Sequence, residues 1–143
     1  MAITEERLEN IRANAELVAR ELSHAMGEKV GFDQASVARV ETFIEGQRAE
    51  FPDTARQLVN VLGCYLGEAV IEAVPGAAWG EDDESGALCI VFPNGDMAFP
   101  FYKVAKQIDD GLENGESILS FYNISVNYVA AGKLGEAASG EAP

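Results

Sequence analysis

The chain has 143 residues, of which 48% are hydrophobic and 24% are charged, a composition that suits one globular domain of ordinary size. It carries 24 acidic and 10 basic residues, a net charge of −14. Binding to nucleic acid or to an anionic membrane needs Lys and Arg to neutralise phosphate, so the charge argues against both. The imbalance is uneven, with 7 bases and 11 acids up to residue 63 but 3 bases and 13 acids after it.

The N-terminal stretch MAITEERLEN is charged and lacks the apolar core of a secretory signal. No apolar run approaches the ~20 residues that a membrane span needs. We therefore expect a cytoplasmic protein. Both cysteines, Cys64 and Cys89, lie in apolar stretches, which predicts reduced thiols within the core.

Residues 4–26 carry apolar side chains at alternating steps of three and four, a spacing typical of an amphipathic helix. Thr4 suits its N-cap and Gly27 suits its end. A second helix is expected from Asp33, a good N-cap, to Glu50, which completes an N-terminal helical pair. The apolar stripe of the first helix consists of Leu8, Ile11, Ala15, Val18, Leu22 and Ala25.

A third and more apolar helix is expected over residues 54–73, with Asp53 or Thr54 as its cap. Gly63 and Gly67 are four residues apart in this helix and therefore share a face. Each glycine costs about 1 kcal/mol of helix propensity relative to alanine. We expect a close approach by another backbone at this face to compensate for that cost.

The pattern then changes to short strands. Residues 87–92 (ALCIVF) and 96–99 (DMAF) flank Asn94 and Gly95, a pair that predicts a hairpin with a two-residue type I′ turn. Residues 77–80 (AAWG) are expected to add a third strand through the acidic loop EDDESG. Three strands covered by helices would form a stable small sheet.

The acidic loop also invites a calcium interpretation. Counted from Glu81, oxygen-bearing side chains occupy the first, third and fifth positions, and Gly86 occupies the sixth. The twelfth position needs a bidentate Glu and holds Phe92, so we favour a solvated hairpin loop and assign no metal. No nucleotide or zinc motif occurs, and His24, the only histidine, lacks a nucleophile motif beside it, so we assign no cofactor and no catalytic residue.

Pro100 suits the first turn of a helix, and Gly111 suits its end. Residues 117–131 alternate as a strand would but also present a helical apolar face, and of the two we favour a helix. The expected fold is α+β, with a small antiparallel sheet of about three strands packed against helices. One domain is expected over residues 1–131, with its N-terminal helices in 1–50 and its core in 54–131. Residues 132–143 are small and polar, which predicts a disordered tail.

A candidate site lies in FPNGDMAFPFYKVAKQ, where Lys103 and Lys106 are three residues apart on the expected helix. Trp79 and Tyr102 are expected nearby, and lysines beside aromatic rings could hold an anionic ligand. The simpler alternative pairs Lys106 with Asp109 or Asp110 and leaves Lys103 in solvent. A third possibility is that Lys106 neutralises a partly buried acid, such as Glu68 on the central helix.

Four segments together resemble a family of small bacterial domains of uncharacterised function: LGCYLGEAV, the tryptophan at position 79, LCIVFPNGDMAFPFYKVAKQI and NGESILSFY. Members carry a Tyr-Leu-Gly-Glu helix, a tryptophan-bearing strand and a Phe-Pro turn into a Lys-Val-x-Lys helix. The resemblance covers about residues 62–122 and implies a core of helix, hairpin and two helices. It implies no activity.

We expect a non-enzymatic binding protein whose partner is another protein, possibly a second copy of itself. The first alternative is a pocket for a small anionic ligand near Lys103 and Lys106. A hydrolytic enzyme that uses His24 is a distant alternative. Size and acidity are also those of immunity proteins, which is an analogy only.

Overall fold

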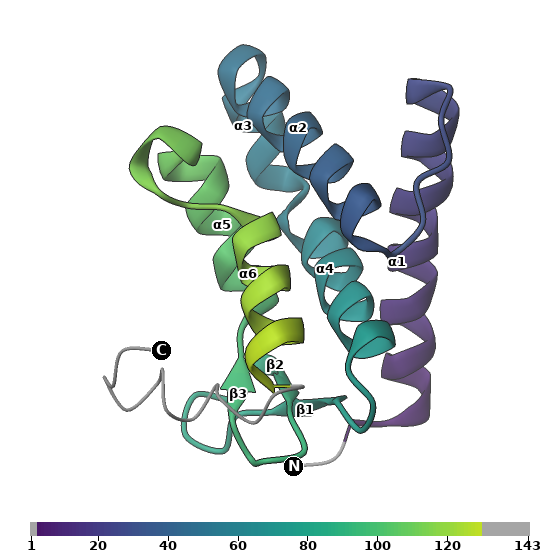
Figure 1. Cartoon of the computed structure of the whole chain (residues 1–143), viewed down its shortest axis with the longest axis vertical. Coiled ribbons are helices and arrows are strands. Elements are labelled where there is room, and N and C mark those ends of the chain that lie inside the picture. Colours follow the sequence, from purple (N-terminus) through teal and green to yellow (C-terminus); the bar gives the residue numbers. More distant parts are fainter. Residues whose placement is uncertain (1–2, 130–143) are drawn as a thin grey trace.

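The computed structural model describes residues 3–129, in which six α-helices and a three-stranded antiparallel sheet form the α+β fold that the sequence predicts (Figure 1). The central helix α4 lies between α1 and α5, and the sheet lies below the helices. The predicted disordered tail lies outside the described residues. The elements in chain order are α1 (Glu5–Met26), α2 (Gln34–Glu50), α3 (Pro52–Gln57), α4 (Val59–Ala73), β1 (Ala78–Glu81), β2 (Leu88–Val91), β3 (Met97–Ala98), α5 (Pro100–Asp110), the 3-10 turn η1 (Leu112–Asn114), α6 (Ile118–Ile124) and the π-helical turn η2 (Ser125–Val129).

The predicted ends of α1 are confirmed. The Thr4 side chain accepts a hydrogen bond from the Arg7 backbone N–H, and Gly27 ends the helix with a left-handed φ of 66°. Asp33 likewise caps α2 by accepting a hydrogen bond from the Ser36 N–H at 2.9 Å. The buried face of α1 consists of Ile11, Ala15, Val18 and Leu22, while Leu8 is partly buried and Ala25 is exposed.

The expected helix over residues 54–73 is in fact two helices. Pro52 occupies the first turn of α3, where its missing N–H is not needed, so Asp53 and Thr54 lie inside this helix instead of capping it. The backbone N–H of Leu58 then bonds to the Ala55 carbonyl at 3.0 Å, which closes a tight turn, and α4 starts at the next residue. The break lets α3 pack on α2 while α4 runs down the middle of the molecule.

The glycine face of α4 is filled by aromatic rings, so the expected approach of another backbone is wrong. A Cβ built on Gly67 would lie 2.0 Å from the Trp79 ring, and one on Gly63 would lie 2.2 Å from the Phe101 ring. These two rings also contact each other, with centroids 5.9 Å apart. Because Gly63 and Gly67 have no side chains, α4 has space on this face for one ring from the sheet and one ring from α5.

The three strands lie in the order β1-β2-β3, with Trp79 opposite Ile90 and Val91 opposite Met97. The acidic segment forms the hairpin loop between β1 and β2, as expected from the sequence. The predicted helical conformation after residue 117 is also confirmed for the described residues by α6 and η2.

The turn between β2 and β3 differs from the expected type I′ turn. Gly95 has a φ of 91°, but no residue other than glycine has a positive φ within residues 3–129, so Asn94 does not adopt the left-handed conformation. The Gly95 N–H bonds to the Phe92 carbonyl and the Phe92 N–H bonds to the Asp96 carbonyl, each at 2.9 Å. The loop therefore has three residues, and Pro93 stands where a type I turn favours proline.

Substitution of Gly67 tests the close packing of the Trp79 ring on α4. Gly67→Ala should lower the free energy of unfolding by about 1–3 kcal/mol, because the added methyl group displaces the Trp79 ring. Gly46→Ala is the matched control on α2, where nothing lies within 4 Å of the new Cβ, and should raise stability by about 0.5–1 kcal/mol. Urea unfolding of both variants provides the measurement, and a stabilising Gly67→Ala would contradict the close packing of the ring on Gly67.

Substitution at Gly95 tests the turn. Nothing lies within 4 Å of a Cβ at this position, so only backbone strain changes. Gly95→Val should cost about 1–2 kcal/mol, because a branched side chain resists a positive φ. Gly95→Asn should cost clearly less, since asparagine tolerates the left-handed region. Equal melting temperatures for the two variants would argue against this conformation.

Candidate functional site

Of the residues predicted to form one site, the structure joins Trp79 and Glu68 directly. Trp79 is buried against α4, and its indole N–H donates a hydrogen bond to the Glu68 carboxylate at 2.8 Å. Tyr102 on α5 is exposed and lines a pocket of about 250 Å³ with Arg7 and Asn60. Arg7 comes from α1, and no pattern in the sequence connects it with Tyr102 on α5.

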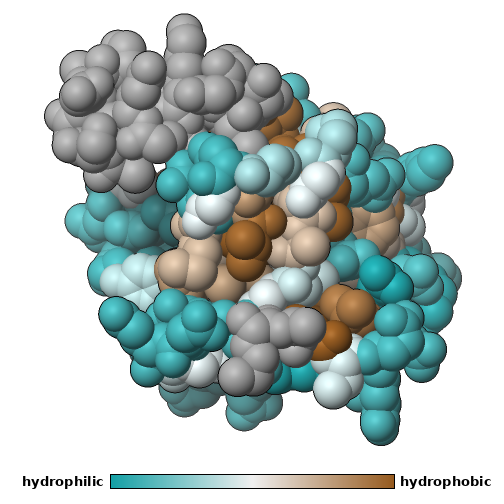
Figure 2. Space-filling model, turned by 90° about the horizontal axis from the view of Figure 1, so that it is seen from below, coloured by the Kyte–Doolittle hydropathy of each residue, from teal (hydrophilic) through white to brown (hydrophobic). Residues whose placement is uncertain are grey.

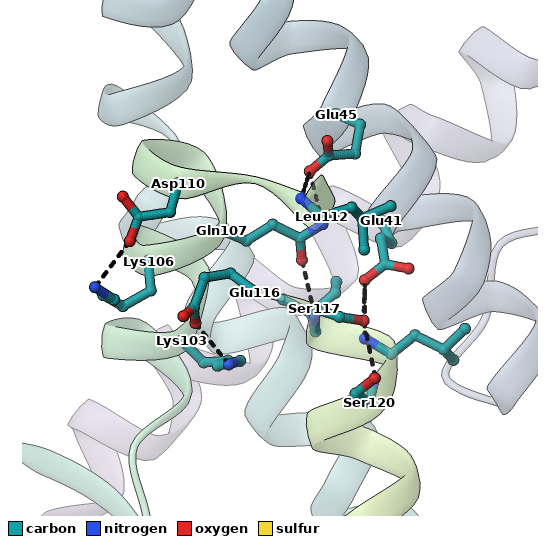
Figure 3. A network of polar contacts seen from close by, with 12 residues as sticks. Glu41, Glu45, Lys103, Lys106, Gln107, Asp110, Leu112, Glu116, Ser117 and Ser120 are labelled. Carbon is teal, nitrogen blue, oxygen red and sulfur yellow. Dashed lines mark hydrogen bonds and ion pairs between the residues drawn. The ribbon is translucent and has the colours of Figure 1, made fainter. Parts of the chain in front are cut away.

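The two lysines have different partners (Figure 3). The Lys106 ammonium lies 2.8 Å from the Asp110 carboxylate, one of the two pairings expected, and this hydrogen bond raises the Lys106 pKa. The other possibility, a pairing of Lys106 with Glu68, is not observed, because Glu68 accepts its hydrogen bond from Trp79. The simpler alternative leaves Lys103 in solvent, and the structure differs from it. The Lys103 ammonium lies 2.7 Å from the Glu116 carboxylate, and both side chains are half-buried.

A buried polar network joins α2 to the start of α6 (Figure 3). Glu41 on α2 accepts hydrogen bonds from the Ser117 hydroxyl and from the backbone N–H of Leu119. Ser117 in turn caps α6 by accepting a hydrogen bond from the Ser120 N–H at 3.0 Å. A carboxylate is favourable at this place, because the N-terminus of a helix carries partial positive charge.

The second part of the network centres on Gln107, which is fully buried on α5. Its carbonyl oxygen accepts from the Ile118 N–H at 2.7 Å, and its amide group donates to the Glu45 carboxylate at 2.9 Å. Within the described chain, no buried side-chain nitrogen or oxygen lacks a hydrogen-bond partner. We therefore interpret this network as structural, since its polar groups are occupied by one another.

A groove of about 540 Å³ lies between β3, the start of α5 and α6, and we call it the lower groove. Its walls are mostly apolar, and Figure 2 shows apolar surface gathered on this end of the molecule within a hydrophilic border. Met97 and Ile124 are 45% and 46% exposed. Of the predicted site residues, Lys103 alone lines this groove. The lining residues are Asp96, Met97, Ala98, Phe99, Lys103, Gly115, Ser120, Phe121, Ile124 and Ser125.

A second, smaller groove of about 160 Å³ opens between α1 and α2 above the start of α4, and we call it the upper groove. Glu21 is its only charged lining residue. The other lining residues are Leu17, Val18, Leu22, Phe43, Leu58, Val61 and Leu62. Periodicity shows that such residues share a helix face, but it does not show which part of that face stays uncovered.

The two thiols of the chain are poorly suited to nucleophilic attack. Cys64 and Cys89 are free, buried thiols, and burial raises the pKa of each above its ordinary value. A protonated thiol is a poor nucleophile. His24 lies exposed in the last turn of α1.

The acidic loop is a closed turn in which the Asp82 carboxylate is bonded within the loop. Asp82 accepts from the Ser85 hydroxyl at 2.7 Å, and this hydrogen bond lowers the Asp82 pKa. The Gly86 N–H bonds back to the Asp82 carbonyl at 2.7 Å. Within residues 3–129, no group of three His, Cys, Asp or Glu side chains is placed to hold a metal ion.

No protein-family model, curated protein or solved structure matches this chain. The resemblance of residues 62–122 to a family of bacterial domains therefore stays a prediction. Among the helices that the structure describes, none combines the length and the apolar character needed to cross a bilayer.

A double-mutant cycle on Lys103 and Glu116 tests the half-buried ion pair. Lys103→Ala should lower the free energy of unfolding by about 1–3 kcal/mol, because it leaves the Glu116 carboxylate without its partner. Glu116→Gln should recover part of that loss in the double variant, which gives a positive coupling energy. Lys106→Ala is the control on the same helix and should change stability little, since its pair with Asp110 is exposed. A coupling energy near zero would contradict the pair.

Proposed function

We propose that this is a cytoplasmic, non-enzymatic interaction protein whose lower groove binds a segment of another protein. The observation that carries the proposal is the groove itself, whose apolar walls come from β3, α5 and α6 and which leaves Met97 and Ile124 about half exposed. Exposed apolar surface on a small protein is characteristic of interaction sites. The volume is large enough for several side chains.

The charge around the lower groove favours a basic partner. The groove is built wholly from residues 96–125, in the half of the chain that has 3 bases and 13 acids. Its one lysine, Lys103, is already neutralised by Glu116 at 2.7 Å, and Asp96 adds a carboxylate at the rim. A segment that combines apolar and basic side chains would complement both the walls and the surrounding field.

The position of β3 supports the binding of a partner segment in an extended conformation. β3 is the last strand in the order β1-β2-β3, so among the described strands only β2 pairs with it. Met97 and Ala98, the two residues of β3, both line the groove. A bound strand could add main-chain hydrogen bonds along this edge while its alternate side chains enter the groove.

The alternative that Lys103 supports is a small amphipathic anion. A volume of about 540 Å³ is within the range of small-molecule pockets, and an ammonium group beside Phe99 and Phe121 would suit a carboxylate with an apolar tail. Such a ligand has to displace Glu116 from Lys103. Lys106 does not line the groove and would take no part.

Selection from a displayed random peptide library tests the proposal. Peptides enriched on the wild-type protein should combine Leu, Phe or Met with Lys or Arg. Their dissociation constants should rise about tenfold or more with Met97→Glu or Ile124→Glu, because a buried apolar contact is lost even though negative charge is added. Leu112→Glu is the control, since this residue is 46% exposed but lies outside the groove.

Two results would contradict the proposal. One is enrichment of acidic peptides, and the other is affinity that the groove variants leave unchanged. A titration with decanoate distinguishes the small-anion alternative from peptide binding. The measurement is the change in NMR chemical shifts of the groove residues. Binding of decanoate that is lost in Lys103→Met, without any peptide binding, would favour that alternative.

A further inference from the structure

We propose that the upper groove is an interface between two copies of this chain. The groove is apolar apart from Glu21, and its rim includes Leu17, which is 38% exposed. α1 packs chiefly on α4 and leaves its side toward α2 open, which is how the groove forms. This surface is separate from the lower groove, and no residue lines both.

The distribution of charge favours a second copy as the occupant. The upper groove is built from residues 17–62, in the half of the chain where 7 bases stand against 11 acids. The remaining half has 3 bases and 13 acids. Contact through the upper groove would therefore bring together the less acidic halves of two chains, whereas contact through the lower groove would bring together the more acidic halves.

The rim of the groove is also self-complementary. Leu17, Arg20 and Glu21 lie three and four residues apart on α1 and form one surface patch. All three are exposed, and within residues 3–129 neither Arg20 nor Glu21 takes part in an ion pair. In a two-fold dimer the same patch meets itself, so Arg20 of each copy can face Glu21 of the other while Leu17 enters the facing groove.

Sedimentation velocity over a range of protein concentrations provides the test. The wild-type chain should show a monomer–dimer equilibrium. Leu17→Glu should raise the dimer dissociation constant roughly 100-fold or more. In a two-fold dimer the substitution occurs in both copies, so two leucines are lost from the interface. Leu112→Glu adds the same charge at another exposed leucine outside both grooves and should leave the constant unchanged. Leu17→Gln replaces Leu17→Glu if circular dichroism shows that the charged variant does not fold.

Charge exchange makes the test specific to this patch. Arg20→Glu and Glu21→Arg should each weaken the dimer, and the double exchange should restore it, because it re-creates both cross-copy pairs in reverse. Added salt should change the wild-type dimer little, because it screens the mutual repulsion of two acidic chains as well as the two cross-copy pairs. Salt should instead weaken the binding of basic peptides to the lower groove, so the two surfaces can be tested apart.

Three results would overturn the inference. The first is a wild-type chain that stays monomeric at all concentrations and salt levels. The second is a dimer that persists in Leu17→Glu but is lost in Ile124→Glu, which would place self-association at the lower groove. The third is a doubly exchanged variant whose dimer is as weak as the dimers of the single variants, which would show that Arg20 and Glu21 do not pair across the interface.

Discussion

The fold depends on two aromatic rings that occupy the space left by two absent side chains. Trp79 comes from the sheet and Phe101 from α5, and their rings lie against Gly67 and Gly63 on α4. The hydrogen bond from the Trp79 indole to Glu68 fixes the depth of the first ring. Since both rings also contact each other, the sheet and α5 are positioned as one unit on the central helix.

Local chemistry explains which parts of the fold could be predicted from the sequence. The Thr4 and Asp33 caps act within three residues of themselves, so the starts of α1 and α2 are readable in the chain. The glycine spacing in α4 indicated a close approach but could not identify what approaches, because that depends on elements far away in the sequence. The turn at Asn94 and Gly95 was misread because Pro93 favours a longer loop.

The candidate site was less predictable than the fold for the same reason. Lys103 was found from its neighbourhood, but its partner Glu116 is thirteen positions away, beyond the end of α5, and no periodic pattern links them. The two grooves are still harder to predict, since an apolar stripe looks alike whether or not another element covers it. The uneven charge of the two halves, by contrast, is visible in the sequence and separates the two proposed partners.

The position of Trp79 has a consequence for observing this protein. It is the only tryptophan, so the tryptophan emission of the molecule reports on one indole. That indole lies where the sheet meets α4, and its N–H is bonded to a carboxylate. Detachment of the hairpin would change its fluorescence while helical circular dichroism stays intact, so partial opening of this junction can be told apart from unfolding of the helices without an added label.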